Sequence, residues 1–225
     1  MRGSRGETVE GAPLARLAPI GSMSEDAEPP LALLFPRPVA RRMHPSVLDE
    51  TILEALSACA AFLEAGEWRG RENELVNLFA LGFLMPRICP PGGNLDPTQI
   101  GIEVAVPQVA EPGKRRTADV RKDLVLWRAP RTTNWTPSVP SESRVLAVME
   151  WKSLNNTGIA ERTPAKHRTH ESDIRWLQAA TSLDTAMNGY AVLADLRAKS
   201  FVVRCTIVRA GQVVLPEHEF RRRTG

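Results

Sequence analysis

The spacing of apolar residues changes at the Pro-Pro-Gly-Gly run of residues 90–93, and this change limits the folds open to the chain. Before the run, apolar residues recur at helical spacing over 46–66 and 70–84. After it, the period of two that is typical of strands covers these segments: 100–106, 120–127, 144–151, 190–196 and 201–208. A helical pattern over 169–183 separates the third strand from the fourth. The order predicts a mixed α/β layer around a small sheet.

Composition divides the chain into three segments. Residues 1–45 are rich in proline and carry no apolar period, which predicts a flexible leader. Residues 46–215 hold the predicted helices and strands, and Ser46 is the expected N-cap of the first helix. Residues 216–225 include three consecutive arginines and are interpreted as a basic tail.

Several features of the sequence favour a cytoplasmic protein. At 225 residues and 43% hydrophobic, the chain can bury a sizeable core. No run reaches the roughly eighteen apolar residues that span a bilayer, and the N-terminus does not resemble a signal peptide. The three cysteines are widely separated and odd in number, so we expect free thiols and neither a disulfide framework nor a zinc site.

The charge is distributed unevenly, although the net charge is only +3. Acids outnumber bases over 46–111, whereas 112–131 contains only two acids, Asp119 and Asp123, among these bases: Lys114, Arg115, Arg116, Arg121, Lys122, Arg128 and Arg131. A basic cluster beside an acidic site suits a protein that holds a phosphate backbone and binds a metal ion. On charge alone, an uneven solvated surface is an equally good interpretation.

Glu150-Trp151-Lys152 ends an otherwise apolar strand and carries the most informative chemistry. Alternation along the strand places Glu150 and Lys152 on one face and Trp151 on the other. If the preceding strand pairs with this one, Asp123 lies close to Glu150, and a divalent cation would relieve the repulsion between the two carboxylates. Oxygen ligands favour Mg²⁺ or Mn²⁺, with Lys152 beside the ion. A plain ion pair at the strand end is the structural alternative.

A third acid comes from the helix predicted over 70–84. Glu72 shares a face with the apolar residues three, four and seven positions later, so it can reach the sheet. Glu74 is the second choice, and Asp119 is the rival of Asp123 because it lies on the same strand face by spacing. A solvated glutamate remains the alternative for either helical acid.

The ordered set of Glu72 on a helix, Asp123 opening a strand and Glu150-Trp151-Lys152 closing the next resembles the PD-(D/E)XK nuclease superfamily, and so does the α-β-β-β-α-β order. Lys122 stands where the superfamily often has proline. The resemblance implies a restriction-endonuclease-like core with a mixed central sheet flanked by helices, here preceded by an extra N-terminal helix. It also implies Mg²⁺-dependent hydrolysis of DNA phosphodiesters, in which Asp123 and Glu150 bind the metal, Lys152 polarises the water and Glu72 completes the catalytic set.

Polar residues in and after the loop expected over 153–168 are candidates for DNA contacts. Together with one residue of the second predicted strand, they form the predicted nucleic-acid-binding set: Lys122, Arg162, Lys166, Arg168, Arg175 and Gln178. Two other functions stay open: a nucleic-acid-binding protein of the same fold without turnover, and an interaction protein that recruits partners through its proline-rich leader. Cutting both strands of DNA usually requires two active sites, so a homodimer is one option for the oligomeric state.

Overall fold

The computed structural model describes residues 44–66, 68, 70–90, 95–107, 119–130, 145–154, 163–197 and 201–221. Its helices are α1 (Pro45–Ala65), α2 (Glu72–Leu78), the π-helix η2 (Phe79–Leu84), α3 (Met85–Ile88), the 3-10 helix η3 (Pro97–Gln99) and α4 (Thr163–Leu183). Its strands are β1 (Ile100–Pro107), β2 (Asp119–Trp127), β3 (Val145–Leu154), β4 (Asn188–Asp195), β5 (Val202–Arg209) and β6 (Gln212–Phe220). The predicted leader, except for Pro45 and the residue before it, lies outside the described residues.

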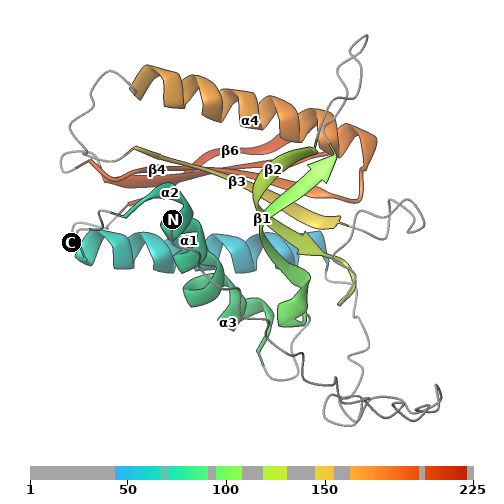
Figure 1. Cartoon of the computed structure of the whole chain (residues 1–225), viewed down its shortest axis with the longest axis horizontal. Helices are drawn as coiled ribbons and strands as arrows, with labels where there is room; N and C mark the ends of the chain where they lie inside the picture. Colours follow the sequence, from blue (N-terminus) through green and yellow to red (C-terminus); the bar gives the residue numbers. More distant parts are fainter. Residues whose placement is uncertain are drawn as a thin grey trace, which may run out of the picture. The chain divides into compact units, whose positions relative to one another are not determined.

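The strands form one mixed sheet in the order β1-β2-β3-β4-β5-β6. Every neighbouring pair is antiparallel except β3 and β4, which are parallel and are connected through α4. In Figure 1, α4 lies on one face of the sheet, and α1 and α2 lie on the other. The predicted α/β class, with a mixed sheet between helices, is therefore confirmed.

The two faces of the sheet bury separate apolar clusters. The first lies between the sheet and α1, α2 and η2, and the second lies between the sheet and α4. The central strands β3 and β4 are buried almost throughout, because helices cover both of their faces. Any charged side chain on β3 therefore needs a partner. Among the described helices, none has an apolar stretch long enough to cross a lipid bilayer.

Both long helices begin earlier than the sequence predicts. The N-cap of α1 is His44, whose ring accepts a hydrogen bond from the Ser46 amide at 3.4 Å, so Ser46 lies inside the helix and does not cap it. The helix predicted over 169–183 begins at Thr163, within the expected polar loop. Its first residues are polar and give no apolar period, but Pro164 in the first turn is a start signal that periodicity misses.

The last strand, β6, is absent from the predicted pattern. A two-residue turn at Ala210 and Gly211, both with positive φ, connects β5 to β6. Most of β6 is exposed at the edge of the sheet, so its residues do not alternate between apolar and polar. The strand continues to Phe220, and its second half occupies residues that the sequence analysis assigns to a basic tail beginning at 216.

Candidate active site

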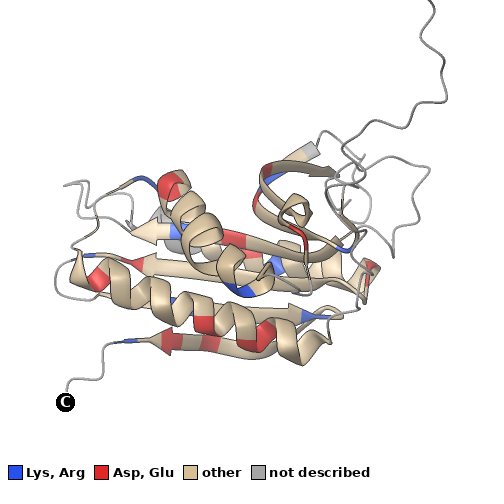
Figure 2. Cartoon of the chain, turned by 90° about the horizontal axis from the view of Figure 1, so that it is seen from below, with Lys and Arg blue, Asp and Glu red and all other residues tan. Residues whose placement is uncertain are grey.

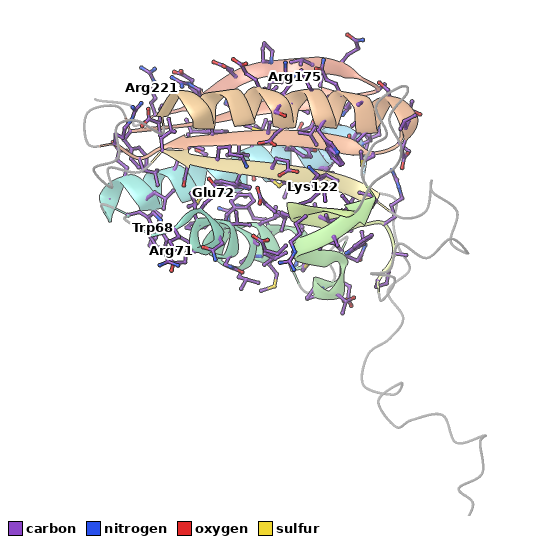
Figure 3. All side chains as sticks on the ribbon, turned by 45° about the horizontal axis from the view of Figure 1, so that its top comes forward. Trp68, Arg71, Glu72, Lys122, Arg175 and Arg221 are labelled. Atoms are coloured by element: carbon purple, nitrogen blue, oxygen red, sulfur yellow. The ribbon has the colours of Figure 1, made fainter. Side chains whose placement is uncertain are left out.

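Charged side chains from α2, β2, β3 and α4 meet beside the C-terminal half of β3. We call this group the charged cluster; its members are Glu72, Lys122, Asp123, Glu150, Lys152 and Asp173. In Figure 3, Glu72 at the start of α2 and Lys122 on β2 both lie beside β3. The structure thus brings together all four residues that the sequence predicts as catalytic.

The end of β3 follows the predicted alternation. Trp151 is fully buried on the α1 side, where its ring packs 4.9 Å from that of Phe79 between centroids. Glu150 and Lys152 lie on the opposite face, toward α4. Glu150 is only 4% exposed, so its carboxylate is held in a poorly hydrated position.

Asp123 lies where β2 separates from β3. The last backbone pair between these strands is Leu124 with Met149, one residue away from Asp123. Beyond that pair, Asp123 Oδ2 accepts a hydrogen bond from the Trp151 amide at 2.6 Å. The carboxylate therefore replaces the backbone acceptor that the ladder no longer supplies, and its charge raises the pKa of Glu150. The side chain of its rival, Asp119, lies outside the described residues.

Lys122 occupies an unexpected face of β2. Leu124 and Leu126 pack in the cluster on the α1 side, and simple alternation would place Lys122 there as well. Instead, the Lys122 ammonium forms an ion pair with Glu150 and lies 3.6 Å from the centre of the Trp176 ring of α4. Lys122 is only 6% exposed, so in this structure it is a buried member of the charged cluster.

The change of face on β2 coincides with an irregularity of β1 at Glu103, whose φ is 54°. The ladder pairs Ile102 with Leu124 and Val104 with Lys122, and Glu103 has no pair in it. Ile102 packs against the core on the α1 side, whereas Val104 packs against the core on the α4 side. Both strands therefore turn over at this point, which carries Lys122 to the same side as Glu150.

Lys152 lies between two carboxylates from different helices. Its Nζ is 3.3 Å from Asp173 Oδ2 and 3.8 Å from Glu72 Oε1, and it donates to the Trp151 carbonyl at 2.7 Å. The other oxygen of Glu72 accepts a hydrogen bond from the Ser153 amide at 2.7 Å, which joins the start of α2 to the end of β3. These contacts fix the orientation of the amine.

The choice between the two helical acids follows from their hydrogen bonds. Glu72 reaches β3, as the spacing of the helix predicts. Glu74 turns back instead and accepts from the Arg71 amide at 2.7 Å, so it caps its own helix. Of the two, only Glu72 belongs to the charged cluster.

Burial and charge compete at the titratable groups of the cluster. Burial raises the pKa of Glu150 to about 7; Lys122 opposes this rise, and the carboxylates of Asp123 and Asp173 add to it. Burial also raises the pKa of Asp173, against the lowering effect of Lys152. Burial lowers the pKa of Lys152, but Asp173 and Glu72 outweigh it, and the pKa lies above its ordinary value. Lys152 is therefore a cation at neutral pH.

The predicted DNA-contacting bases are only partly described. Arg162 and the side chains of Lys166 and Arg168 lie outside the described residues, although the backbone of the latter two belongs to α4. Arg175 is exposed on α4. Basic and acidic residues are interspersed over the described elements in Figure 2, so the described part of the surface does not by itself indicate a polyanionic ligand.

On α4, the structure replaces one predicted contact with two that the sequence analysis missed. The Gln178 amide donates to the Gly211 carbonyl at 3.3 Å, at the turn between β5 and β6, so Gln178 does not join the charged cluster. Asp173 and Trp176 contact the two lysines of the cluster instead. Asp173 lies four residues before the buried Leu177, and this helical spacing is the signal that could have identified it.

The oxygen atoms of the charged cluster are of the chemical type that the expected metal prefers as ligands. Asp123 and Glu150 offer carboxylate oxygens from adjacent strands, which is the chemistry that Mg²⁺ and Mn²⁺ prefer. Within the part of the chain that the structure describes, no group of three or more His, Cys, Asp or Glu side chains is arranged to hold a metal ion by itself. The ammonium of Lys122 stands beside Glu150, where a cation would bind.

A cavity elsewhere on the molecule has different chemistry. It has a volume of about 420 Å³ and lies between α1 and the residues that flank β5 and β6. Small or apolar side chains such as Ala60, Ala61 and Phe201 form most of its lining, with Glu64 and Arg221 at its polar part. No member of the charged cluster lines it, so the cavity does not extend the candidate site.

A comparison of the chain with protein-family models, with curated proteins and with solved structures finds no match. The assignment of a function therefore depends on the residues of the charged cluster and on the order of the elements around it.

Proposed function

We propose that the protein is a metal-dependent endonuclease that hydrolyses DNA phosphodiester bonds, with a restriction-endonuclease-like core. The observation that carries the proposal is the meeting of Glu72, Asp123, Glu150 and Lys152 at one end of β3. The order α2-β1-β2-β3-α4-β4, with β3 parallel to β4, agrees with the core that the motif implies.

Each residue has a role that follows from its surroundings. Asp123 and Glu150 would hold the metal through carboxylate oxygens, and the Trp151 amide fixes the orientation of Asp123. The metal would supply positive charge that stabilises the transition state and lowers the pKa of an attacking water. Lys152 is a partly buried cation that can donate to the attacking oxygen or to the phosphate. Glu72 acts through Lys152 by keeping its amine near β3.

A nucleic-acid-binding protein without turnover is the second candidate. One observation favours it: both lysines of the cluster are paired with carboxylates of the same chain, Lys122 with Glu150 and Lys152 with Asp173. Such pairs satisfy the buried charges without any ligand. The interaction-protein alternative depends on the leader, nearly all of which lies outside the residues that the structure describes.

Cleavage of supercoiled plasmid separates these candidates. The wild-type protein should nick plasmid in Mg²⁺ or Mn²⁺ and not in chelator. Asp123→Asn keeps an oxygen for the Trp151 amide but loses a charged ligand, so cleavage should fall by at least about a hundredfold. Glu171→Gln, an exposed change on α4, is the matched control and should cut at the wild-type rate.

DNA binding in chelator completes the test. Asp123→Asn removes a negative charge that repels phosphate, so metal-free binding should equal or exceed that of the wild type. Binding by the wild type without any metal-dependent nicking would favour the second candidate. Cleavage by Asp123→Asn at the wild-type rate would contradict the proposed mechanism.

A further inference from the structure

Lys122 has the surroundings of a cation-binding site. Its ammonium contacts the carboxylate of Glu150 on one side and the face of Trp176 on another, at 3.6 Å from the ring centre. Lys122 is 6% exposed and Glu150 is 4% exposed, so water supplies little of the stabilisation of either charge. Within the cluster, the position beside Glu150 is thus built to hold a positive charge, and a residue of the chain already supplies that charge.

A divalent metal and this ammonium would compete for the same carboxylate. Two positive charges within about 4 Å of each other repel, and they do so more strongly near a protein surface than in water. Lys122 cannot lose this contact without cost, because a buried ammonium needs a partner. A metal that binds Glu150 must therefore displace Lys122 or accept the repulsion.

We propose that Lys122 is a built-in competitor of the divalent metal: its ammonium occupies the cation position at Glu150 and must move away before the metal binds there. This inference rests on the proposed function, which makes Glu150 a metal ligand. The long side chain of Lys122 can swing away from Glu150, and a phosphate group of the substrate would offer the displaced ammonium a new anionic partner.

Calorimetric titration of Mn²⁺ into the full-length protein, without DNA and at mildly alkaline pH, tests the inference independently of cleavage. Lys122→Gln removes the competing charge but leaves an amide that can donate to Glu150. Its affinity for Mn²⁺ should exceed that of the wild type by about tenfold or more, from the repulsion that it relieves. Lys122→Arg keeps the charge and should bind Mn²⁺ no more tightly than the wild type.

Arg121→Gln is the matched control, because Arg121 is the exposed neighbour of Lys122 and carries the same charge. Its affinity for Mn²⁺ should stay within about twofold of the wild type, since screening weakens exposed charges. Equal tightening by Arg121→Gln and Lys122→Gln would overturn the inference, because it would reduce the effect to net charge. Unchanged affinity in Lys122→Gln would overturn it as well.

Two further measurements keep the outcome decisive. If Lys122→Gln folds poorly, the increase of its melting temperature on adding Mn²⁺ replaces calorimetry, and it should exceed the increase seen in the wild type. Glu150→Gln tests the proposed function separately. If Glu150→Gln binds Mn²⁺ as tightly as the wild type, or if no variant binds Mn²⁺, the metal site of the proposed function is wrong and the inference fails with it. If Glu150→Gln weakens Mn²⁺ binding but Lys122→Gln does not tighten it, the inference fails and the proposed function stands.

Discussion

Glu150 shows at the scale of one residue how burial and charge oppose each other. Its carboxylate is almost entirely removed from water, which disfavours the ionised form, and Lys122 supplies only partial compensation. Asp123 and Asp173 add further negative charge around it. The ionised form of Glu150 is therefore unfavourable, and a bound cation would stabilise it. Carboxylates with pKa values perturbed in this manner are common at functional sites.

The raised pKa of Glu150 predicts a pH dependence of stability. Between the ordinary value of 4.5 and about 7, the folded protein keeps a proton that the unfolded chain has released. The free energy of unfolding should therefore fall as pH rises through this window, by up to about 1.4 kcal/mol per pH unit. Glu150→Gln should flatten this decline, as measured by urea unfolding at several pH values in chelator. The exposed-site variant Glu171→Gln should keep the wild-type slope; an unchanged slope in Glu150→Gln would contradict the prediction.

At the scale of elements, the irregularity of β1 at Glu103 organises the site. The backbone φ of Glu103 is 54°, and such an angle strains any residue other than glycine by about 1 to 2 kcal/mol. On either side of Glu103, Ile102 packs against the apolar cluster on the α1 side and Val104 packs against the one on the α4 side, so the strained residue lies where β1 changes faces. One consequence is that Lys122 joins Glu150 on the α4 side and does not enter the core on the α1 side.

Two glycine substitutions on β1 test this strain. Glu103→Gly should leave the protein at least as stable as the wild type, because glycine adopts a positive φ without steric cost. Ala105→Gly, at an exposed position of the same strand, should lose about 0.5 to 1 kcal/mol through chain entropy alone. The check is the free energy of unfolding in urea, and equal losses in both variants would show that Glu103 is not strained.

At the scale of the whole molecule, α1 is part of the folded domain although it lies outside the motif-bearing segment. One face of α1 packs into the first apolar cluster with Leu48, Ile52, Leu56 and Leu63 fully buried. A polar network also attaches α1 to the sheet, where Tyr190 donates to Asp49 at 2.7 Å. The same cluster extends to Phe220 of β6, so the core connects both ends of the described chain.

Two truncations should therefore differ sharply. Removal of residues 1–40 should leave the melting temperature and the proposed nuclease activity nearly unchanged, because that proline-rich segment has no apolar period and is predicted to be a flexible leader. Removal of residues 1–66 also deletes α1, whose larger apolar side chains each stabilise the fold by about 1.5 to 3 kcal/mol. Their sum is comparable to the whole stability of a domain, so this variant should show no cooperative melting. A large loss of stability in the shorter truncation would contradict the prediction.

Features that depend on local periodicity could be predicted from the residues alone. Alternation along β3 placed Glu150 and Lys152 on the face opposite Trp151, and helical spacing turned Glu72 toward the sheet. The buried face of α1 followed from the same rule. These predictions hold because the period of a strand or a helix is set by its own backbone and needs no information from distant residues.

Which charges meet depends on contacts between elements that are far apart in the chain. Lys122 reaches Glu150 next to a gap in the β1–β2 ladder, where Glu103 on the other strand has a positive φ, and no local pattern around Lys122 reveals this. Asp173 pairs with Lys152 only because α4 crosses over the parallel strands β3 and β4. Partners of buried charges are chosen by packing between elements that are far apart in the chain, and the spacing of residues within one element does not encode that choice.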